Sequence, residues 1–259
     1  MYAEERRRQI ASLTAVEGRV NVTELSQRFN VTAETIRRDL AVLDHDGIVH
    51  RVHGGAVATQ NFQTTEFSLD ARSRSAISAK NAIAREALSF VPESQGGIFL
   101  DAGTSVASLA ELLATHPQSQ RWSIVTNCLS IALSLANAGL DEVQLLGGTV
   151  RAITQAVVGD TALRTLALMR ADVAFIGTNA LTLDHGLSTA DSQEAAVKRA
   201  MITNAQRVIV LCDSTKMGND YLVSFAGIDD IDVVITDKGA PQSMVDALLD
   251  REVQVVIAQ

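Results

Sequence analysis

The hydrophobic pattern of the chain changes near residue 58. Before that point, apolar side chains recur at the three- and four-residue spacing of amphipathic helices. After residue 90, short runs of Val, Ile and Leu alternate with helix-like segments. Near-continuous apolar runs are typical of parallel strands buried on both faces of a sheet. The pattern therefore predicts a helical N-terminal domain and a C-terminal α/β domain with a mainly parallel sheet.

Three helices are expected in the N-terminal domain. The first spans Ala3–Glu17, Thr23 is expected to cap the second, and the third covers Thr32–Leu43 with Thr32 as its N-cap. A tight turn at Asn30-Val31 separates the last two helices. Two short helices joined by a tight turn form a helix-turn-helix.

A β-hairpin is expected to follow the third helix. Residues 48–53 alternate apolar and polar side chains, which is the period of a strand with one buried face. Gly54-Gly55 then turns the chain back on itself. A helix-turn-helix followed by such a hairpin is a winged helix-turn-helix, which we expect over residues 1–58.

The third helix is suited to reading DNA. Ile36, Leu40 and Leu43 lie within about 60° of one another around its axis, which leaves two arginines on other faces. Arginine presents a planar donor fork that matches guanine or phosphate. Residues 1–57 contain eight arginines and eight acidic residues, so the net charge of −8 belongs to the rest of the chain. The predicted DNA contacts are Thr23, Thr32, Glu34, Thr35, Arg37, Arg38, Arg51 and His53.

Residues 59–78 lack clear periodicity and are rich in Thr, Gln, Ser and Asn. We expect a connector there, with Phe62, Phe67 and Leu69 able to dock onto the domain that follows over residues 79–259. Ser78 is expected to cap a helix running to about Phe90. The strands of the parallel sheet are expected at 97–100, 122–125, 143–146, 173–176, 208–211, 233–235 and 253–257.

The residues that directly follow these runs are candidates for ligand binding, because open α/β sheets bind ligands outside the carboxyl ends of their strands. Gly103-Thr-Ser105 opens a helix whose free N–H groups suit an anion such as phosphate. Simple capping and turn roles are the alternative at each position, including Asp213-Ser-Thr. The predicted effector-binding residues are Asp101, Gly103, Thr104, Ser105, Thr126, Asn127, Gly147, Gly148, Arg151 and Lys216.

Several functional classes find no support in the sequence. It has no GxGxxG, GxxxxGK[ST] or HExxH motif, so dinucleotide, Walker-type nucleotide and zinc-hydrolase sites are not expected. Cys128 and Cys212 lack metal-ligand spacing, and free thiols in a reducing cytosol are expected. No signal peptide or membrane span is apparent. We therefore expect a cytoplasmic protein with no cofactor, no metal and no membrane partner.

Specific motifs resemble one family. Thr-Ile-Arg-Arg-Asp-Leu at residues 35–40, with Val22-Thr-Glu-Leu25 before it and Arg51-Val-His-Gly-Gly-Ala56 after it, closely resembles the N-terminal signature of DeoR-family bacterial transcriptional regulators. The motifs that resemble the DeoR sensor domain are Leu100-Asp-Ala-Gly-Thr-Ser105, Val125-Thr-Asn127, Leu146-Gly-Gly148 and Asp213-Ser-Thr-Lys216. One departure is Ser105, where many members have a second Thr, although the hydroxyl is kept.

The resemblance implies a sensor domain similar in fold to sugar-phosphate isomerases and glucosamine-phosphate deaminases, with a phosphorylated sugar as effector. The chain looks closest to actinobacterial repressors of sugar phosphotransferase-system genes. The leading hypothesis is a non-enzymatic repressor that is a homodimer or homotetramer. It binds double-stranded operator DNA, and a sugar phosphate releases it from that DNA.

Two alternatives stay open at this stage. In the first, the body is an active sugar-phosphate isomerase or deaminase. Asp101, Asp191 and Asp213 supply carboxylates for it, although spacing marks out no His or carboxylate pair for proton transfer. In the second, the body is only an oligomerisation scaffold. Turnover of phosphosugars would favour the enzyme, and no binding across a panel of phosphosugars would favour the scaffold.

Overall fold

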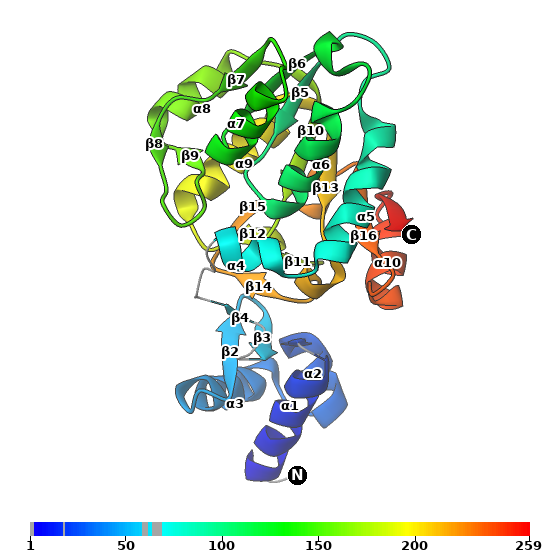
Figure 1. Cartoon of the computed structure of the whole chain (residues 1–259). Coiled ribbons are helices and arrows are strands. Elements are labelled where there is room, and N and C mark those ends of the chain that lie inside the picture. Colours follow the sequence, from blue (N-terminus) through cyan, green and yellow to red (C-terminus); the bar gives the residue numbers. More distant parts are fainter. Residues whose placement is uncertain (1–2, 18, 59–61, 64–68) are drawn as a thin grey trace. The chain divides into compact units, whose positions relative to one another are not determined.

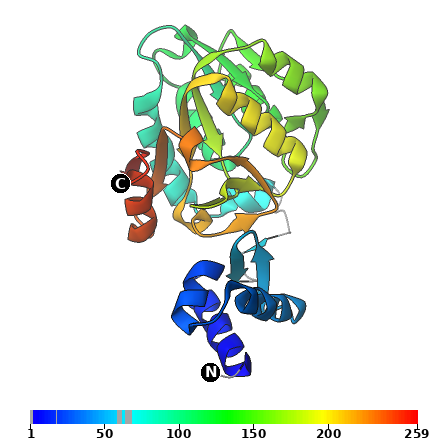
Figure 2. The ribbon, with the colours of Figure 1, turned by 180° about the vertical axis from the view of Figure 1, so that it is seen from behind.

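The computed structural model describes residues 3–17, 19–58, 62–63 and 69–259. The chain forms two compact units. One unit, called the head, comprises Met1–Thr64 with Gly218–Asp220, and the other, called the body, comprises Thr65–Met217 with Tyr221–Gln259. Figures 1 and 2 show the elements of each unit from two opposite sides.

The head is built from three helices and a small antiparallel sheet with strand order β1-β3-β2 (Figure 1). Apolar residues from all of these elements form its core, including Ile10, Leu25, Ile36, Leu40 and Val49. This arrangement confirms the predicted winged helix-turn-helix. The elements are α1 (Ala3–Glu17), β1 (Arg19–Asn21), α2 (Val22–Phe29), α3 (Ala33–His45), β2 (Val49–Val52), β3 (Gly55–Ala58) and β4 (Phe62–Gln63).

The start of α2 differs from the prediction. Asn21, not Thr23, is its N-cap, because the Asn21 side-chain oxygen accepts a hydrogen bond from the backbone N–H of Glu24 at 3.0 Å. Asn is at least as effective an N-cap as Thr, and here it stands one residue before the first turn. Thr23 therefore lies inside α2. The predicted cap of α3 is confirmed, since the hydroxyl of Thr32 accepts from the backbone N–H of Thr35 at 3.2 Å.

The body contains a seven-stranded parallel sheet with strand order β17-β16-β13-β10-β5-β6-β7. Each of the seven predicted apolar runs forms one of these strands, which confirms the α/β class. The strands are β5 (Gly96–Leu100), β6 (Trp122–Thr126), β7 (Val143–Leu145), β10 (Ala171–Gly177), β13 (Ala205–Leu211), β16 (Val233–Asp237) and β17 (Gln254–Ala258).

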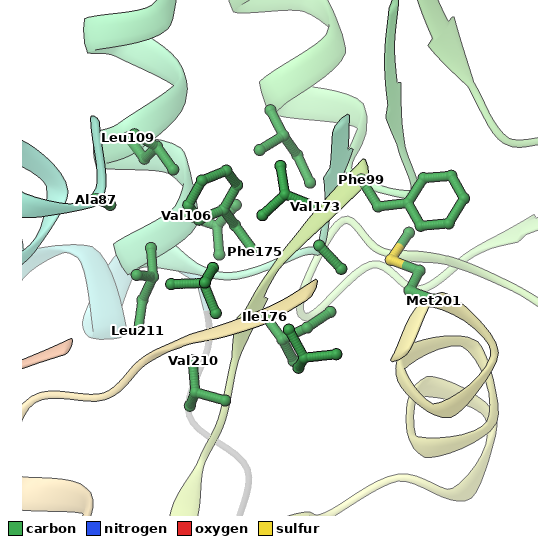
Figure 3. Packing of buried hydrophobic residues seen from close by; sticks show 14 of the residues in the cluster. Ala87, Phe99, Val106, Leu109, Val173, Phe175, Ile176, Met201, Val210 and Leu211 are labelled. Carbon is green, nitrogen blue, oxygen red and sulfur yellow. The ribbon is translucent and has the colours of Figure 1, made fainter. Parts of the chain in front are cut away.

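Helices cover both faces of this sheet, with α5, α6 and α7 on one face and α9 on the other (Figures 1 and 2). Figure 3 shows Val106 and Leu109 of α6 on one side of β10 and Met201 of α9 on the other. The helices are α4 (Leu69–Arg74), α5 (Ile77–Ala87), α6 (Thr104–Ala114), α7 (Leu129–Asn137), α8 (Asp160–Ala167), α9 (Ser192–Thr203) and α10 (Gln242–Leu249).

Short elements complete the body, and none was predicted as a separate element, although Leu88–Phe90 falls within the helix expected to run from Ser78 to about Phe90. They are two to four residues long, which is too short for a hydrophobic period to develop. The strands are β8 (Thr149–Val150), β9 (Val157–Val158), β11 (Ala180–Thr182), β12 (Gly186–Thr189) and β15 (Val223–Ala226), together with β14 (Asp220–Tyr221), whose first residue belongs to the head. The 3₁₀ turns are Leu88–Phe90, Ser119–Arg121, Ser214–Lys216 and Ile228–Asp230.

The segment between the predicted domains holds two differences. The helix α4 lies inside the stretch expected to be a connector. Ser78 is not an N-cap, because α5 begins at Ile77 after Ala76, which has a left-handed backbone with φ of 49°. Ala76 occupies the N-cap position, and no side chain caps α5. Phe67 and the side chain of Phe62, expected to dock onto the body, lie outside the described residues.

Within the described ranges, no helix has the length and apolar character needed to cross a bilayer.

Candidate functional site

The direction of chain progress through the sheet reverses between β5 and β10. From β5 the chain proceeds through β6 to β7 toward one edge, whereas β10, β13, β16 and β17 follow one another toward the other edge. Such a switch point leaves a crevice at the carboxyl ends of the two central strands, where open α/β sheets bind their ligands. Residues 101–105 follow β5 and residues 177–179 follow β10, so both segments border this crevice.

A small cavity of about 20 Å³ lies at this switch point. The first turn of α6, the segment after β10 and side chains from α4, α9 and the turn after β13 enclose it. The lining residues are Arg72, Ala102, Gly103, Thr104, Ser105, Gly177, Thr178, Asn179, Lys198 and Lys216.

The amino end of α6 supplies hydrogen-bond donors to the cavity. Gly103 is the N-cap residue, and no side chain caps the helix. The first backbone N–H groups of a helix have no partner within the helix, and they carry the positive end of its dipole. With the hydroxyls of Thr104 and Ser105 beside them, they form a surface suited to an anion.

Lys198 reaches the same cavity from α9 and makes a buried ion pair with Asp101. Its ammonium also donates to the carbonyl oxygen of Gly177 at 2.9 Å. Burial raises the pKa of Asp101 above its ordinary value, against the effect of the Lys198 charge. Asp101 Oδ2 accepts from the backbone N–H of Gly177 at 3.0 Å, while Oδ1 is buried without a partner among the described residues. The pair therefore ties β5, β10 and α9 together below the cavity.

Lys216 is positioned by two aspartates that shape the turn after β13. Asp213 caps this turn by accepting from the backbone N–H of Thr215 at 3.2 Å. Asp237, at the end of β16, accepts from the backbone N–H and the hydroxyl of Ser214 at 2.6 and 2.9 Å. Burial favours a higher pKa for Asp237, but the hydrogen bonds from Ser214 and Gly239 outweigh it and the pKa is lowered. The ionised carboxylate thus holds the turn in place.

Arg72 approaches the cavity from α4. Its Nη1 donates to Asn179 Oδ1 at 3.3 Å, and its Nε is buried without a partner among the described residues. Among the described residues, the structure records no ion pair for Arg72 or Lys216. These two cations therefore keep the ability to bind an anion.

The predicted effector-binding residues divide into two groups. Gly103, Thr104, Ser105 and Lys216 line the cavity. Asp101, Thr126, Asn127, Gly147, Gly148 and Arg151 do not line it.

Residues of the second group make structural interactions instead. The amide oxygen of Asn127 accepts from the backbone N–H of Ala102 at 2.9 Å, so Asn127 holds the loop after β5 rather than facing the cavity. The hydroxyl of Thr126 accepts from the backbone N–H of Cys128 at 3.0 Å. Arg151 forms ion pairs with Glu194 at 2.5 Å and with Asp191 at 3.4 Å.

Sequence reasoning missed Arg72 and Lys198. Arg72 lies in a segment without periodicity, and nothing in the local sequence places it near β5. Lys198 had a usable signal, because it follows Val197 and precedes Met201 on a helix whose buried face these residues share. A lysine at a buried helical position requires a charged partner, which in this protein is Asp101.

A larger surface hollow of about 610 Å³ lies at the opposite, amino-terminal edge of β5 and β6. Asp141 and Glu142 contribute two carboxylates to its lining, against the single cation Arg121. It lies at the wrong end of a parallel sheet for ligand binding, and its carboxylates disfavour an anion. We therefore place the candidate site at the switch point.

In the described part of the chain, no cluster of three His, Cys, Asp or Glu side chains is arranged to hold a metal ion.

The predicted DNA contacts lie on the surface of the head. The side chain of Arg38 is 82% exposed and that of Arg37 is 57% exposed, each within 3.7 Å of a carboxylate oxygen of Glu34. Exposed ion pairs of this kind contribute little free energy, so both arginines can exchange Glu34 for a DNA phosphate or base. All eight residues occupy exposed or half-buried positions: Thr23, Thr32, Glu34, Thr35, Arg37, Arg38, Arg51 and His53.

Comparison with known sequences bears on both units. The profile of the "DeoR-like helix-turn-helix domain" matches residues 6–62, and that of the "DeoR C terminal sensor domain" matches residues 75–238. The chain belongs to the DeoR family. DeoR-family membership makes it a DNA-binding transcriptional regulator, as the predicted resemblance implied. The narrower resemblance to actinobacterial members remains a prediction.

Two relatives illustrate the DeoR-family similarity. An HTH-type transcriptional regulator GlpR of Haloferax volcanii is 35% identical, over 92% of this chain and 91% of the relative. A lactose phosphotransferase system repressor of Streptococcus mutans is 34% identical, over 92% of this chain and 93% of the relative. Among solved structures, a ribose 5-phosphate isomerase A from Methanocaldococcus jannaschii has a TM-score of 0.40 and 16% identity over 53% of each chain.

Proposed function

We propose that this DeoR-family regulator is a repressor of genes for sugar uptake or metabolism and that a phosphorylated sugar releases it from operator DNA. The name of the Streptococcus mutans relative, a repressor of a lactose phosphotransferase system, supports the sugar assignment. In this proposal residues 1–58 bind DNA, residues 59–78 connect, and residues 79–259 sense the sugar phosphate. A head of this size needs a homodimer or homotetramer to reach useful operator affinity.

The observation that carries the effector assignment is the convergence of donors and cations at the switch point. The uncapped first turn of α6 and the side chains of Arg72, Lys198 and Lys216 surround one cavity. Lys198 is neutralised by Asp101, so the surplus positive charge comes from Arg72 and Lys216. Charged donors of this kind form strong hydrogen bonds with phosphate oxygens. A dianionic phosphate ester fits this charge better than a neutral sugar does.

For the head, we propose that α3 is the recognition helix. Its inner face is fixed by Ile36, Leu40 and Leu43, which are all at most 4% exposed. The same helix carries Arg37 and Arg38 on its exposed surface. An arginine held at a fixed angle in the major groove reads guanine through two hydrogen bonds.

The enzyme alternative needs a general base that touches a substrate. Asp101 is the carboxylate closest to that role, but it is 0% exposed and is bound by Lys198. A base that is fully buried and ion-paired has to give up its partner before it can abstract a proton. We therefore propose a non-catalytic body. Turnover of ribose-5-phosphate or glucosamine-6-phosphate by the purified protein would contradict this.

The test of the proposed function is operator binding with and without phosphosugars. A gel-shift at fixed salt should show release by at least one member of a panel of sugar phosphates, and the parent sugars should be inactive. By linkage, the same compound must bind less tightly to the DNA-bound protein, by the same factor.

The variant Lys216→Ala should keep operator affinity and lose the release. Lys238→Ala is the matched control, because Lys238 is exposed and does not line the cavity. Calorimetric silence across the panel would favour the scaffold alternative. Loss of DNA binding in Lys216→Ala would show misfolding instead.

A further inference from the structure

The cavity at the switch point is too small for the ligand that its chemistry favours. Its volume of about 20 Å³ suffices for roughly one water molecule. Pockets that bind small molecules usually measure about 300–1,000 Å³. A sugar phosphate can therefore enter only if part of the wall moves.

The strands and α6 are poor candidates for that movement, because they belong to the buried core of the body. Leu100, Val106 and Ile176, which flank the cavity in sequence, are all 0% exposed. Close-packed interiors resist displacement. The helix α4 has only six residues, and the three whose burial is described, Leu69, Arg72 and Ser73, do not belong to the buried apolar core. It is the wall that costs least to move.

In the part of the chain that the structure describes, a few polar contacts hold α4 in place. At its start, the backbone N–H of Leu69 donates to the carbonyl oxygen of Ile153 at 2.9 Å. In its middle, Arg72 binds Asn179 at 3.3 Å. At its end, the ammonium of Lys80 donates to the carbonyl oxygens of Arg72 and Ser75, the latter at 2.6 Å. Each of these hydrogen bonds can be exchanged for one with water or a ligand at small net cost.

Arg72 is the part of α4 that an anion attracts most strongly. Its guanidinium has only the neutral oxygen of Asn179 as a recorded side-chain partner, and its buried Nε has none among the described residues. A guanidinium binds a phosphate through two parallel charge-assisted hydrogen bonds, which are about twice as strong as neutral ones. An entering phosphate therefore replaces Asn179 as the partner of Arg72.

We propose that α4 is a movable wall of the effector site, and that Arg72 is the phosphate ligand that couples its displacement to effector binding. This inference rests on the proposed function and adds the residue and the element through which the effector acts. The closed position of α4 excludes the effector sterically, so the effector binds only the displaced position. A ligand that discriminates between two positions in this way shifts the equilibrium between them.

The displacement has a direct route to the DNA-binding unit. Along the chain, α4 is the first described helix of the body, and the element before it is β4 of the head. A displacement of α4 therefore moves the first described helix that follows the head in the chain. Effector binding and operator binding then share one equilibrium, as linkage requires.

The test uses the full-length protein and measures hydrogen–deuterium exchange by mass spectrometry, together with calorimetry and operator gel-shifts. The probes are inorganic phosphate, fructose-1-phosphate, glucosamine-6-phosphate and glycerol-3-phosphate. In the wild type, a bound probe should speed amide exchange in residues 69–76 several-fold and leave α6 unchanged or slower.

The variant Arg72→Gln should bind the active probe about 10- to 100-fold more weakly, which is the loss expected for a charge-assisted pair of hydrogen bonds. It should lose the exchange response, and the probe should no longer release it from operator DNA at the wild-type concentration. Arg72→Lys, which keeps the charge but not the fork, should lie between Arg72→Gln and the wild type. Arg85→Gln is the control, because Arg85 is an exposed arginine on α5. Melting temperatures equal to that of the wild type show that each variant is folded.

Two results would overturn the inference while the proposed function stands. One is release of DNA by the probe in Arg72→Gln at the wild-type concentration. The other is probe binding to the wild type without faster exchange in residues 69–76. If the wild type binds no probe, the proposed effector class fails, and the inference fails with it.

Discussion

Arg6 of α1 and Asp39 of α3 form a buried ion pair in the core of the head, with 2.6 Å between Nε and Oδ2. The two side chains are 8% and 7% exposed. Asp39 follows Arg37 and Arg38 in the chain but points to the opposite side of α3, toward the interior. The pair therefore fixes the rotation of α3 about its axis, and with it the direction in which the two exposed arginines project.

Breaking this pair should destabilise the head. Asp39→Ala leaves Arg6 buried without a counter-charge, which typically costs about 3–5 kcal/mol. Urea denaturation followed by circular dichroism should show this loss, and operator binding should fall with it. Asp46→Ala, at an exposed position just after α3, is the control and should change stability little. A double variant, Arg6→Met with Asp39→Leu, should recover most of the stability, and failure to do so would argue against the pair as the cause.

Arg38→Ala should weaken specific operator binding by about 1–3 kcal/mol, because a bidentate base contact has that value. Its exposed side chain supports no part of the core, so the melting temperature should stay unchanged. The measurement is a gel-shift at fixed salt against operator and unrelated DNA. Unchanged operator affinity would remove Arg38 from the recognition surface. Arg85→Ala on the body is the matched control.

Gly55→Ala should disrupt the wing. A Cβ atom at Gly55 would lie 2.0 Å from the carbonyl oxygen of Val20, because β1 and β3 pair at this position. The strands must separate to relieve that clash. Gly54→Ala meets open space and bears only the cost of a left-handed backbone, about 1–2 kcal/mol. Thermal unfolding should therefore rank Gly55→Ala below Gly54→Ala, and the reverse order would show that the strand pairing is loose in solution.

Lys80 should make stability rise with pH. Burial lowers the pKa of Lys80 to about 8. The negative charge of Asp213 opposes this shift, and the positive charges of Lys216 and Arg72 add to it. Between that value and the ordinary 10.5, the unfolded chain holds a proton that the folded chain has lost. The free energy of unfolding therefore increases by about 1–3 kcal/mol as the pH rises through this window. Below the window, Lys80 is charged in the folded state and its burial lowers the free energy of unfolding by the full amount.

The measurement is urea denaturation of the wild type and Lys80→Met from about pH 7 to about pH 10. The wild type should gain stability relative to Lys80→Met as the pH rises. Lys238→Met, at an exposed position, should follow the wild type in parallel. A constant difference between the wild type and Lys80→Met would show that the pKa of Lys80 is the same in the folded and unfolded chain.

Much of the fold was accessible to sequence reasoning because its elements are periodic. The stripe of Ile36, Leu40 and Leu43 predicts the inner face of α3, and all three side chains are buried. The seven apolar runs predict the strands of the sheet for the same reason. Local signals failed where two residues compete for one role. Asn21 and Thr23 are both good N-caps, and only the path of the chain out of β1 selects Asn21.

Only part of the candidate site could be predicted from the sequence. Gly103-Thr-Ser105 and Lys216 follow strands directly, so the topology of a parallel sheet places them at the carboxyl edge. The same argument selected Asn127 and Arg151. In the structure, Asn127 hydrogen-bonds the loop after β5, and Arg151 forms ion pairs within the body. Position at the edge does not determine which side chains face the crevice.

The sequence by itself determined the two-part architecture, the family and the chemistry of the strand ends, because periodicity and motifs are local properties of the chain. Only the tertiary structure decided which cations meet at the switch point. Arg72 and Lys198 come from a short helix and from the buried face of a distant one, and no local pattern relates either to β5. Their convergence depends on strand order and helix packing, which are set by contacts between residues far apart in the chain.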